Sequence, residues 1–263
     1  METVEGKVEG IYYKYQKNNE ADHTLVLLHG LTGNSSIWNG HIEILKDDKV
    51  NFLNVDLSGH GHSDTPKSLE GYLFEAQAGK ILKIIEFLKI NKITIVSYSY
   101  STRIGSLLYE ELKEKTKGMI FIGPYFKIEK GFKEKLFSKF VGVVWEYLIP
   151  NKKHYLDYSK LQNYEKPTFW DNRYTLKSMN TKDYLGSLFA LVSFPQNGDL
   201  GIENIKIPTL FIYGRKDRAL PQRYRDIIEN LENVKIKTLE NKDHLFLATN
   251  ARVVAAEIRD FAL

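Results

Sequence analysis

The stretch ITIVSYSYSTRIG, residues 93–105, joins an apolar run to a helical pattern through three alternating serines. A strand that turns sharply into a helix can expose a serine nucleophile at the turn, usually within the pattern G-x-S-x-G. Strand and helix approach each other closely there, so the residues two before and two after the nucleophile must be small. Ser99 has Ser97 and Ser101 at those positions, whereas each of the other two serines has a large side chain at one of them. The spacing therefore predicts Ser99 as the nucleophile of an elbow whose glycines are replaced by serine.

The stretch alone leaves a second role for Ser99 open, because serines at a helix start are also common capping residues. As a nucleophile, Ser99 would need a base from elsewhere in the chain. A serine hydroxyl becomes a nucleophile when a histidine takes its proton. In the chain order Ser…Asp/Glu…His, only His154 and His244 come late enough. His154 precedes every late strand, whereas His244 stands on a loop after the apolar run at 234–239. We expect His244 to be the base, the alternative being an exposed loop histidine.

An acid is needed to orient that histidine and fix its tautomer. Asp217 follows the apolar run TLFIY at 209–213, on the loop RKDRALP. Asp243 is the rival, but its position next to His244 in the chain makes the required contact between the two side chains awkward. Asp217 is therefore the expected acid, and a turn-forming aspartate is the structural alternative.

Two N–H donors are expected to hold the oxyanion of an acyl-transfer transition state. One is the backbone N–H of Tyr100, the residue after the nucleophile. The other is expected from the loop after the apolar run TLVLL, where Gly30 and Gly33 allow close approach of the backbone. Leu31 N–H is the best candidate on that loop, and His29 is interpreted as structural.

Short β-branched runs alternate with amphipathic helical patterns over most of the chain. This alternation predicts a parallel α/β sheet, because parallel strands joined by helices are covered on both faces. The expected strands span residues 11–15, 24–28, 50–55, 93–97, 119–122, 209–213 and 234–239. The expected helices span residues 73–89, 100–114, 221–231 and 246–262.

The alternation stops within residues 125–200, where 16 of the 33 aromatic residues fall. We expect 125–200 to form a helical cap over the carboxyl ends of the strands, inserted into a core made of 1–124 and 201–263. Aromatic cap residues such as Trp145 and Trp170 are candidates to contact a substrate. The structural alternative is additional hydrophobic core under a helical insertion.

Four segments resemble motifs of the α/β-hydrolase fold family, in the family's order and over nearly the whole chain. They are HGL at 29–31, DLSGHGHS at 56–63, YGRKD at 213–217 and DH at 243–244. The resemblance implies a mostly parallel eight-stranded sheet flanked by helices, with a helical cap insertion and a Ser-Asp-His triad. Ser58 replaces the usual arginine of the second motif, just as serines replace the usual glycines of the elbow. The family alone does not fix a substrate.

The composition excludes several kinds of site and of binding partner. The chain has no cysteine, which excludes disulfides, cysteine-bound zinc and a cysteine nucleophile. Lysine and glutamate are interleaved at a net charge of +4, so nucleic-acid binding is not expected. The first residues, METVEGKVEG, lack the apolar core of a secretory signal, and no stretch is apolar enough for a membrane span. A cytoplasmic location is expected.

These features together predict a serine hydrolase of carboxylic esters, a carboxylesterase that works through an acyl-enzyme and needs no metal or organic cofactor. The aromatic segment favours a small-molecule ester with an apolar or aromatic group. The same triad also serves lactonases, thioesterases, aminopeptidases, C–C hydrolases and lyases, which these residues do not separate. A ligand receptor with vestigial hydrolysis is the alternative from another functional class.

Overall fold

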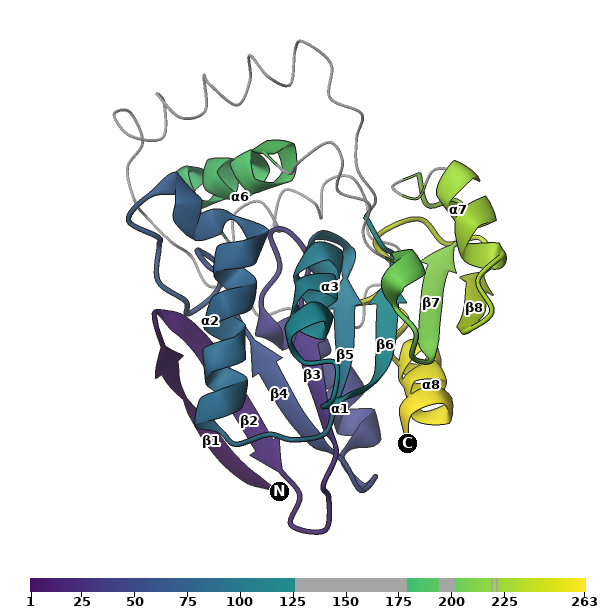
Figure 1. The fold of residues 1–263 in the computed structure, drawn as a ribbon, viewed down its shortest axis with the longest axis horizontal. Coiled ribbons are helices and arrows are strands. Elements are labelled where there is room, and N and C mark those ends of the chain that lie inside the picture. Colours follow the sequence, from purple (N-terminus) through teal and green to yellow (C-terminus); the bar gives the residue numbers. More distant parts are fainter. Residues whose placement is uncertain (126–178, 194–201, 219, 221) are drawn as a thin grey trace.

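A single eight-stranded sheet forms the centre of the computed structural model, which describes residues 1–125, 179–193, 202–218, 220 and 222–263. The strand order is β1-β2-β4-β3-β5-β6-β7-β8 (Figure 1). The strands are β1 (Glu2–Val8), β2 (Ile11–Lys17), β3 (Thr24–Leu28), β4 (Asn51–Val55), β5 (Ile93–Tyr98), β6 (Thr116–Ile122), β7 (Thr209–Gly214) and β8 (Val234–Leu239). β2 pairs antiparallel with both β1 and β4, and all other neighbouring strands are parallel. The sheet is therefore mostly parallel, as the sequence predicts.

β1 is the one strand that the apolar runs do not predict. Its sequence, ETVEGKV, is exposed or half-buried along its whole length. It forms because its backbone pairs in register with β2, from Glu2 opposite Lys17 to Val8 opposite Ile11. An edge strand can remain polar because it needs a partner on one side only.

Two layers of helices cover the sheet. α2 (Phe74–Phe87) and α3 (Thr102–Glu111) lie on one face, and α1 (Asn39–Leu45) and α8 (Ala251–Ala262) lie on the other (Figure 1). Alternate side chains of one strand enter different cores, since Ile95 packs with α2 and α3 whereas its neighbour Val96 packs with α1 and α8. Burial on both faces explains why the inner strands β3, β4, β5 and β7 are largely apolar runs.

The helix predictions are confirmed in kind but differ at their ends. α7 (Gln222–Glu229) forms within the expected helix 221–231. α8 begins at Ala251 rather than 246, because Phe246 carbonyl oxygen accepts from the Thr249 N–H and the Asn250 side chain in a turn. α1 has only seven residues, too few to show an amphipathic pattern in the sequence.

α6 (Thr181–Ser193) is the part of the expected cap that the structure describes best. It packs against η2 (Leu69–Tyr72), a 3₁₀ helix. The Asp183 carboxylate, buried at the start of α6, accepts hydrogen bonds from the Tyr72 hydroxyl at 2.5 Å and the Thr65 hydroxyl at 3.0 Å. These contacts join the first turn of α6 to the part of the chain that contains the sheet.

Trp145, Trp170 and His154 lie outside the described residues, as does most of the segment expected to form the cap. The division into 1–124, 125–200 and 201–263 therefore stays a prediction.

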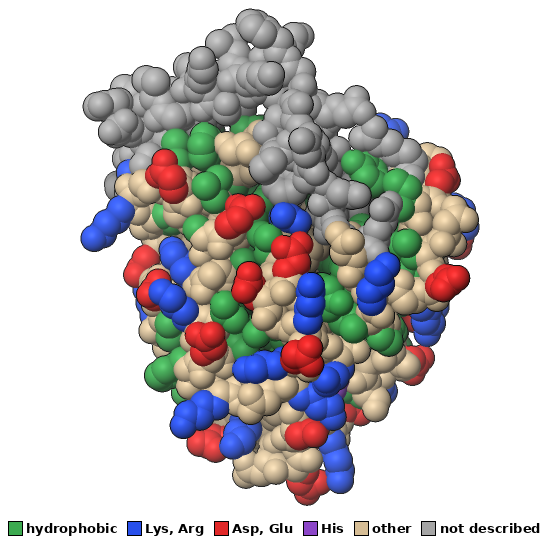
Figure 2. Space-filling model, in the orientation of Figure 1, with side chains coloured by type: hydrophobic (Ala, Val, Ile, Leu, Met, Phe, Trp, Pro, Cys, Tyr) green, Lys and Arg blue, Asp and Glu red, His purple; other side chains and the backbone are tan. Residues whose placement is uncertain are grey.

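The surface mixes both signs of charge. Figure 2 shows Lys and Arg side chains interspersed with Asp and Glu side chains on the visible face. No helix within the described parts of the chain combines the length and apolar character needed to cross a membrane.

Candidate active site

Ser99 stands at a sharp turn between strand β5 and helix α3. A short 3₁₀ helix, η3 (Ser99–Ser101), links the two elements. Ser99 has a φ of +52°, in the left-handed region that residues other than glycine seldom adopt. Such strained backbone is concentrated at functional sites, where the surrounding structure holds it in place. The strand, turn and helix around Ser99 are the context that a nucleophilic serine requires.

The two serines that flank the elbow are accommodated in different ways. Ser101 Oγ accepts a hydrogen bond from Tyr98 N–H at 3.0 Å and lies 3.0 Å from the Leu28 carbonyl oxygen, to which it donates. Ser97 Oγ is buried without a hydrogen-bond partner among the described residues. Room for it comes from Gly105 in α3, where an added Cβ would lie 2.1 Å from that oxygen. Ser101 thus connects the elbow to β3 by a hydrogen bond, whereas Ser97 occupies the space beside Gly105 without a bond to the described residues.

The three residues predicted from the sequence lie in one hydrogen-bonded row. Ser99 Oγ is 2.6 Å from His244 Nε2, and His244 Nδ1 is 2.9 Å from Asp217 Oδ2. The Asp217 carboxylate is an acceptor only, so Nδ1 carries the proton and Nε2 is left to accept from the serine hydroxyl. Asp217 is 2% exposed, whereas the His244 side chain is 27% exposed. The acid is therefore sequestered, and the base borders solvent.

Asp243, the rival acid, has a different role. Its Oδ1 accepts the Leu245 N–H at 3.0 Å, a bond to a nearby backbone group typical of a turn. Its side chain is exposed.

The loops that carry Asp217 and His244 are joined by their backbones. Arg215 N–H donates to Leu239 O at 3.0 Å, and Lys216 N–H donates to Lys242 O at 2.9 Å. Gly214, the last residue of β7, permits this approach, because an added Cβ would lie 2.3 Å from Lys242 O. The neighbouring ends of β7 and β8 thus bring acid and base together.

Leu31 and Tyr100 occupy the backbone segments beside Ser99. Tyr100 follows Ser99 directly, and an added Cβ on Gly30 would lie 3.4 Å from Ser99 Cβ. Gln77 Nε2 donates to the Tyr100 hydroxyl at 3.1 Å. Burial raises the pKa of that hydroxyl well above its usual value, which keeps it neutral. Use of the two N–H groups as oxyanion donors stays a prediction.

His29 is a buried link between two loops. Its Nε2 accepts the Leu57 N–H at 3.0 Å, and its Nδ1 donates to Gly30 O at 2.7 Å. Burial lowers the pKa of His29, in keeping with a neutral ring. These contacts agree with the structural interpretation of this residue.

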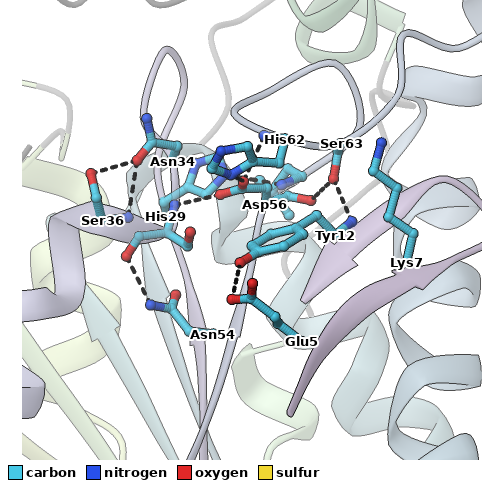
Figure 3. A network of polar contacts seen from close by, with 12 residues as sticks. Glu5, Lys7, Tyr12, His29, Asn34, Ser36, Asn54, Asp56, His62 and Ser63 are labelled. Carbon is cyan, nitrogen blue, oxygen red and sulfur yellow. Dashed lines mark hydrogen bonds and ion pairs between the residues drawn. The ribbon is translucent and has the colours of Figure 1, made fainter. Parts of the chain in front are cut away.

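The DLSGHGHS turn forms a separate polar network, shown in Figure 3. The buried Asp56 carboxylate accepts N–H groups of Ser35 at 2.6 Å and His62 at 2.8 Å, and lies 3.4 Å from His62 Nδ1. Burial would raise the pKa of Asp56, but the His62 side chain, His29 and the N–H donors outweigh it and hold this pKa below its usual value. The network connects the end of β4 to the loops around it.

Ser58, which replaces the arginine usual in this turn, is fully buried. Its N–H donates to Gln77 Oε1 at 3.1 Å. The ammonium group of Lys80, from α2, lies 3.5 Å from Ser58 Oγ. A cation from a neighbouring helix therefore lies beside the serine of this turn.

Tyr98 is the site residue that sequence reasoning missed. It is buried beside Ser99, and its ring stacks on His244. The sequence signal was an aromatic residue next to the nucleophile, which the strand pattern alone assigns to the core.

Within the described residues, no three His, Asp or Glu side chains are grouped to hold a metal ion.

Comparison with known proteins finds a family model and several similar proteins. Residues 23–251 match the family model described as alpha/beta hydrolase fold. A pimeloyl-[acyl-carrier protein] methyl ester esterase from Wigglesworthia glossinidia brevipalpis is 28% identical, over 81% of this chain and 82% of that protein. A putative 2-succinyl-6-hydroxy-2,4-cyclohexadiene-1-carboxylate synthase from Bacillus subtilis is 22% identical, over 96% of this chain and 95% of that protein. A solved esterase structure from Thermogutta terrifontis superposes with a TM-score of 0.75 at 16% identity, covering 99% of this chain and 97% of that one.

Proposed function

We propose that this chain, which belongs to the α/β-hydrolase fold family, is a serine hydrolase that cleaves carboxylic esters through an acyl-enzyme. The observation that carries the proposal is the row formed by Ser99, His244 and Asp217, with hydrogen-bond distances of 2.6 Å and 2.9 Å. A nucleophile within reach of a base, and a base oriented by a carboxylate, is the arrangement that acyl transfer requires.

In the first half of the reaction, His244 Nε2 takes the hydroxyl proton as Ser99 Oγ bonds to the ester carbonyl carbon. The Asp217 carboxylate, buried and hydrogen-bonded to Nδ1, stabilises the resulting imidazolium. The tetrahedral intermediate collapses as the alcohol leaves with the proton from His244. Ser99 then carries the acyl group.

In the second half, water gives a proton to His244 Nε2 and attacks the acyl carbonyl carbon. The carboxylic acid is released, and the proton returns to Ser99 Oγ. In both halves the N–H groups of Leu31 and Tyr100 would hold the oxyanion. Removal of one such donor typically costs about 10²–10³ in rate.

Esters are favoured over other acyl compounds because two of the similar proteins are named as esterases. The synthase among the relatives leaves another reaction of the same three residues as the second candidate. An apolar or aromatic substituent on the substrate remains an inference from the aromatic content of residues 125–200.

The test is hydrolysis of p-nitrophenyl esters of graded acyl length, beside lactone, thioester and amide substrates. The native chain is compared with Ser99→Ala and with Ser106→Ala as a matched control, since Ser106 is buried in α3 and its hydroxyl only donates to Thr102 O. We expect ester turnover that collapses in Ser99→Ala alone. Equal activity in Ser99→Ala and the native chain would overturn the proposed nucleophile. Faster turnover of another substrate class would overturn the ester assignment.

A further inference from the structure

Tyr98 makes two contacts with His244 that proton transfer itself does not use. The two rings are stacked, with centroids 5.8 Å apart and planes at 21°. The Tyr98 hydroxyl also donates to the His244 carbonyl oxygen at 2.9 Å. Tyr98 therefore contacts both the imidazole ring and the backbone of His244.

The surrounding backbone leaves a slot for the Tyr98 ring. Strands β3 and β6 flank β5 in the sheet, and each is followed by a glycine near its carboxyl end. An added Cβ on Gly30 would lie 3.0 Å from Tyr98 Cδ1, tighter than ordinary contact. An added Cβ on Gly123 would lie 3.4 Å from Tyr98 Cε2 and 3.4 Å from His244 Nδ1. The slot thus continues from the tyrosine ring to the imidazole.

His244 needs such support because of where it lies. It stands in a turn between β8 and α8, outside any strand. Its ring must accept a proton from Ser99 and later deliver one to the leaving group without losing Asp217. Small displacements of a reacting group can cost about 10²-fold in rate. Tyr98 is the last residue of β5 and Ser99 follows it directly, so a contact from Tyr98 holds the base close to the nucleophile.

We propose that Tyr98 is a positioning residue that holds the imidazole of His244 in line with Ser99 and Asp217. The inference rests on the proposed hydrolase function for its kinetic consequence. Its structural consequence, an ordered His244 ring, can be measured without turnover.

The test compares Tyr98→Phe with the native chain, with Tyr109→Phe as control. Tyr98 is 6% exposed and Tyr109 5%, and each hydroxyl makes a hydrogen bond to a backbone group, so the two substitutions remove similar buried groups. In Tyr98→Phe we expect kcat to fall about twofold to tenfold, the range for one neutral hydrogen bond, with KM unchanged. Tyr109→Phe should keep the native kcat. Melting temperatures show whether both variants are folded.

The second arm observes the Nδ1 proton between His244 and Asp217 by NMR. The native chain and Tyr109→Phe should give a low-field resonance protected from solvent exchange. In Tyr98→Phe, and more so in Tyr98→Leu, this resonance should broaden. Native kcat together with a native resonance in Tyr98→Phe would overturn the inference. If the native chain hydrolysed no ester, the ester proposal would fail by itself, and the resonance alone would decide the role of Tyr98.

Discussion

Two histidine–aspartate pairs lie within the described parts of the chain, and they differ in what surrounds the histidine ring. In the pair of His244 and Asp217, Nδ1 is 2.9 Å from the carboxylate and Nε2 faces Ser99 Oγ at 2.6 Å. In the pair of His62 and Asp56, Nδ1 is 3.4 Å from the carboxylate, the side chain is 49% exposed, and the ring packs on Tyr12. A buried aspartate beside a histidine is thus shared by a proposed catalytic site and a turn.

The surroundings of the two carboxylates explain this difference. Asp56 accepts backbone N–H groups of Ser35 and His62, and its own carbonyl oxygen accepts from the Ser63 hydroxyl at 2.5 Å. Its bonds therefore hold loops together. Asp217 Oδ2, by contrast, lies 2.9 Å from a ring nitrogen of a base that touches a strained serine. A strained serine beside the histidine, rather than the histidine–aspartate pair itself, therefore distinguishes the proposed catalytic site from the turn.

The largest expected effect separates the two histidines. His244→Gln should lower kcat by about 10⁶-fold, the loss typical of removing a triad base. His62→Gln, a matched change in the other pair, should leave kcat within about twofold, because the ring packs in a structural turn. Steady-state kinetics on the best ester measures both. A similar loss in the two variants would remove the functional distinction between the pairs.

The two aspartates should respond in opposite ways. Asp217→Asn should reduce kcat by about 10⁴-fold through the wrong imidazole tautomer, with little change in stability. Asp56→Asn should keep the activity of the folded fraction but lower the free energy of unfolding by about 2–4 kcal/mol, because one of the two buried acceptor oxygens becomes an NH₂ group that faces a backbone N–H. Urea denaturation beside kinetics provides the measurement. The reverse pattern would contradict the assigned roles.

The two serines that flank Ser99, Ser97 and Ser101, should affect the free energy of unfolding in opposite directions. Ser101→Ala should lower the free energy of unfolding by about 1 kcal/mol, because its hydroxyl joins the elbow to Leu28. Ser97→Ala should raise it by a similar amount, since the buried Ser97 hydroxyl has no partner within the described residues. Chemical denaturation at neutral pH tests both. Equal destabilisation would show that Ser97 also makes a bond that holds the elbow.

The smallest effect concerns pH. The hydrogen bond to Asp56 raises the pKa of His62 above its usual value of 6.5. The charged ring therefore stabilises the folded chain fully below pH 6.5, and this stabilisation is lost as pH rises through the folded-state pKa. The half-exposed position limits it to less than about 1 kcal/mol. The fall in unfolding free energy from pH 6.5 upward should be larger in the native chain than in His62→Gln, and identical profiles would contradict the pairing.

The sequence predicts the parts of the fold whose burial forces an apolar pattern. The seven strands from β2 to β8 are short apolar or alternating runs, and α2 and α3 show amphipathic spacing. β1 is not predicted, because its sequence, ETVEGKV, lacks an apolar pattern. Its conformation depends on backbone pairing with β2 rather than on burial of side chains.

The site could be predicted as far as chain order and residue size determine it. Ser99 follows from the small residues on either side, and Asp217 and His244 follow from their places after β7 and β8. Tyr98 could not be predicted, because its place in an apolar strand gives no sign that its ring stacks on His244 or that its hydroxyl donates to the His244 carbonyl oxygen. The Asp56–His62 contact depends likewise on how the turn closes, which the motif alone does not state.

The central claim is that Ser99 is the nucleophile, and covalent labelling tests it most directly. The folded native chain would be treated with a fluorophosphonate, and the modified residue located by peptide mass spectrometry, with Ser99→Ala treated in parallel. We expect a single adduct on Ser99, loss of ester hydrolysis in proportion to labelling, and no adduct in Ser99→Ala. An adduct on Ser97 or Ser101, or continued hydrolysis by a fully labelled chain, would contradict it.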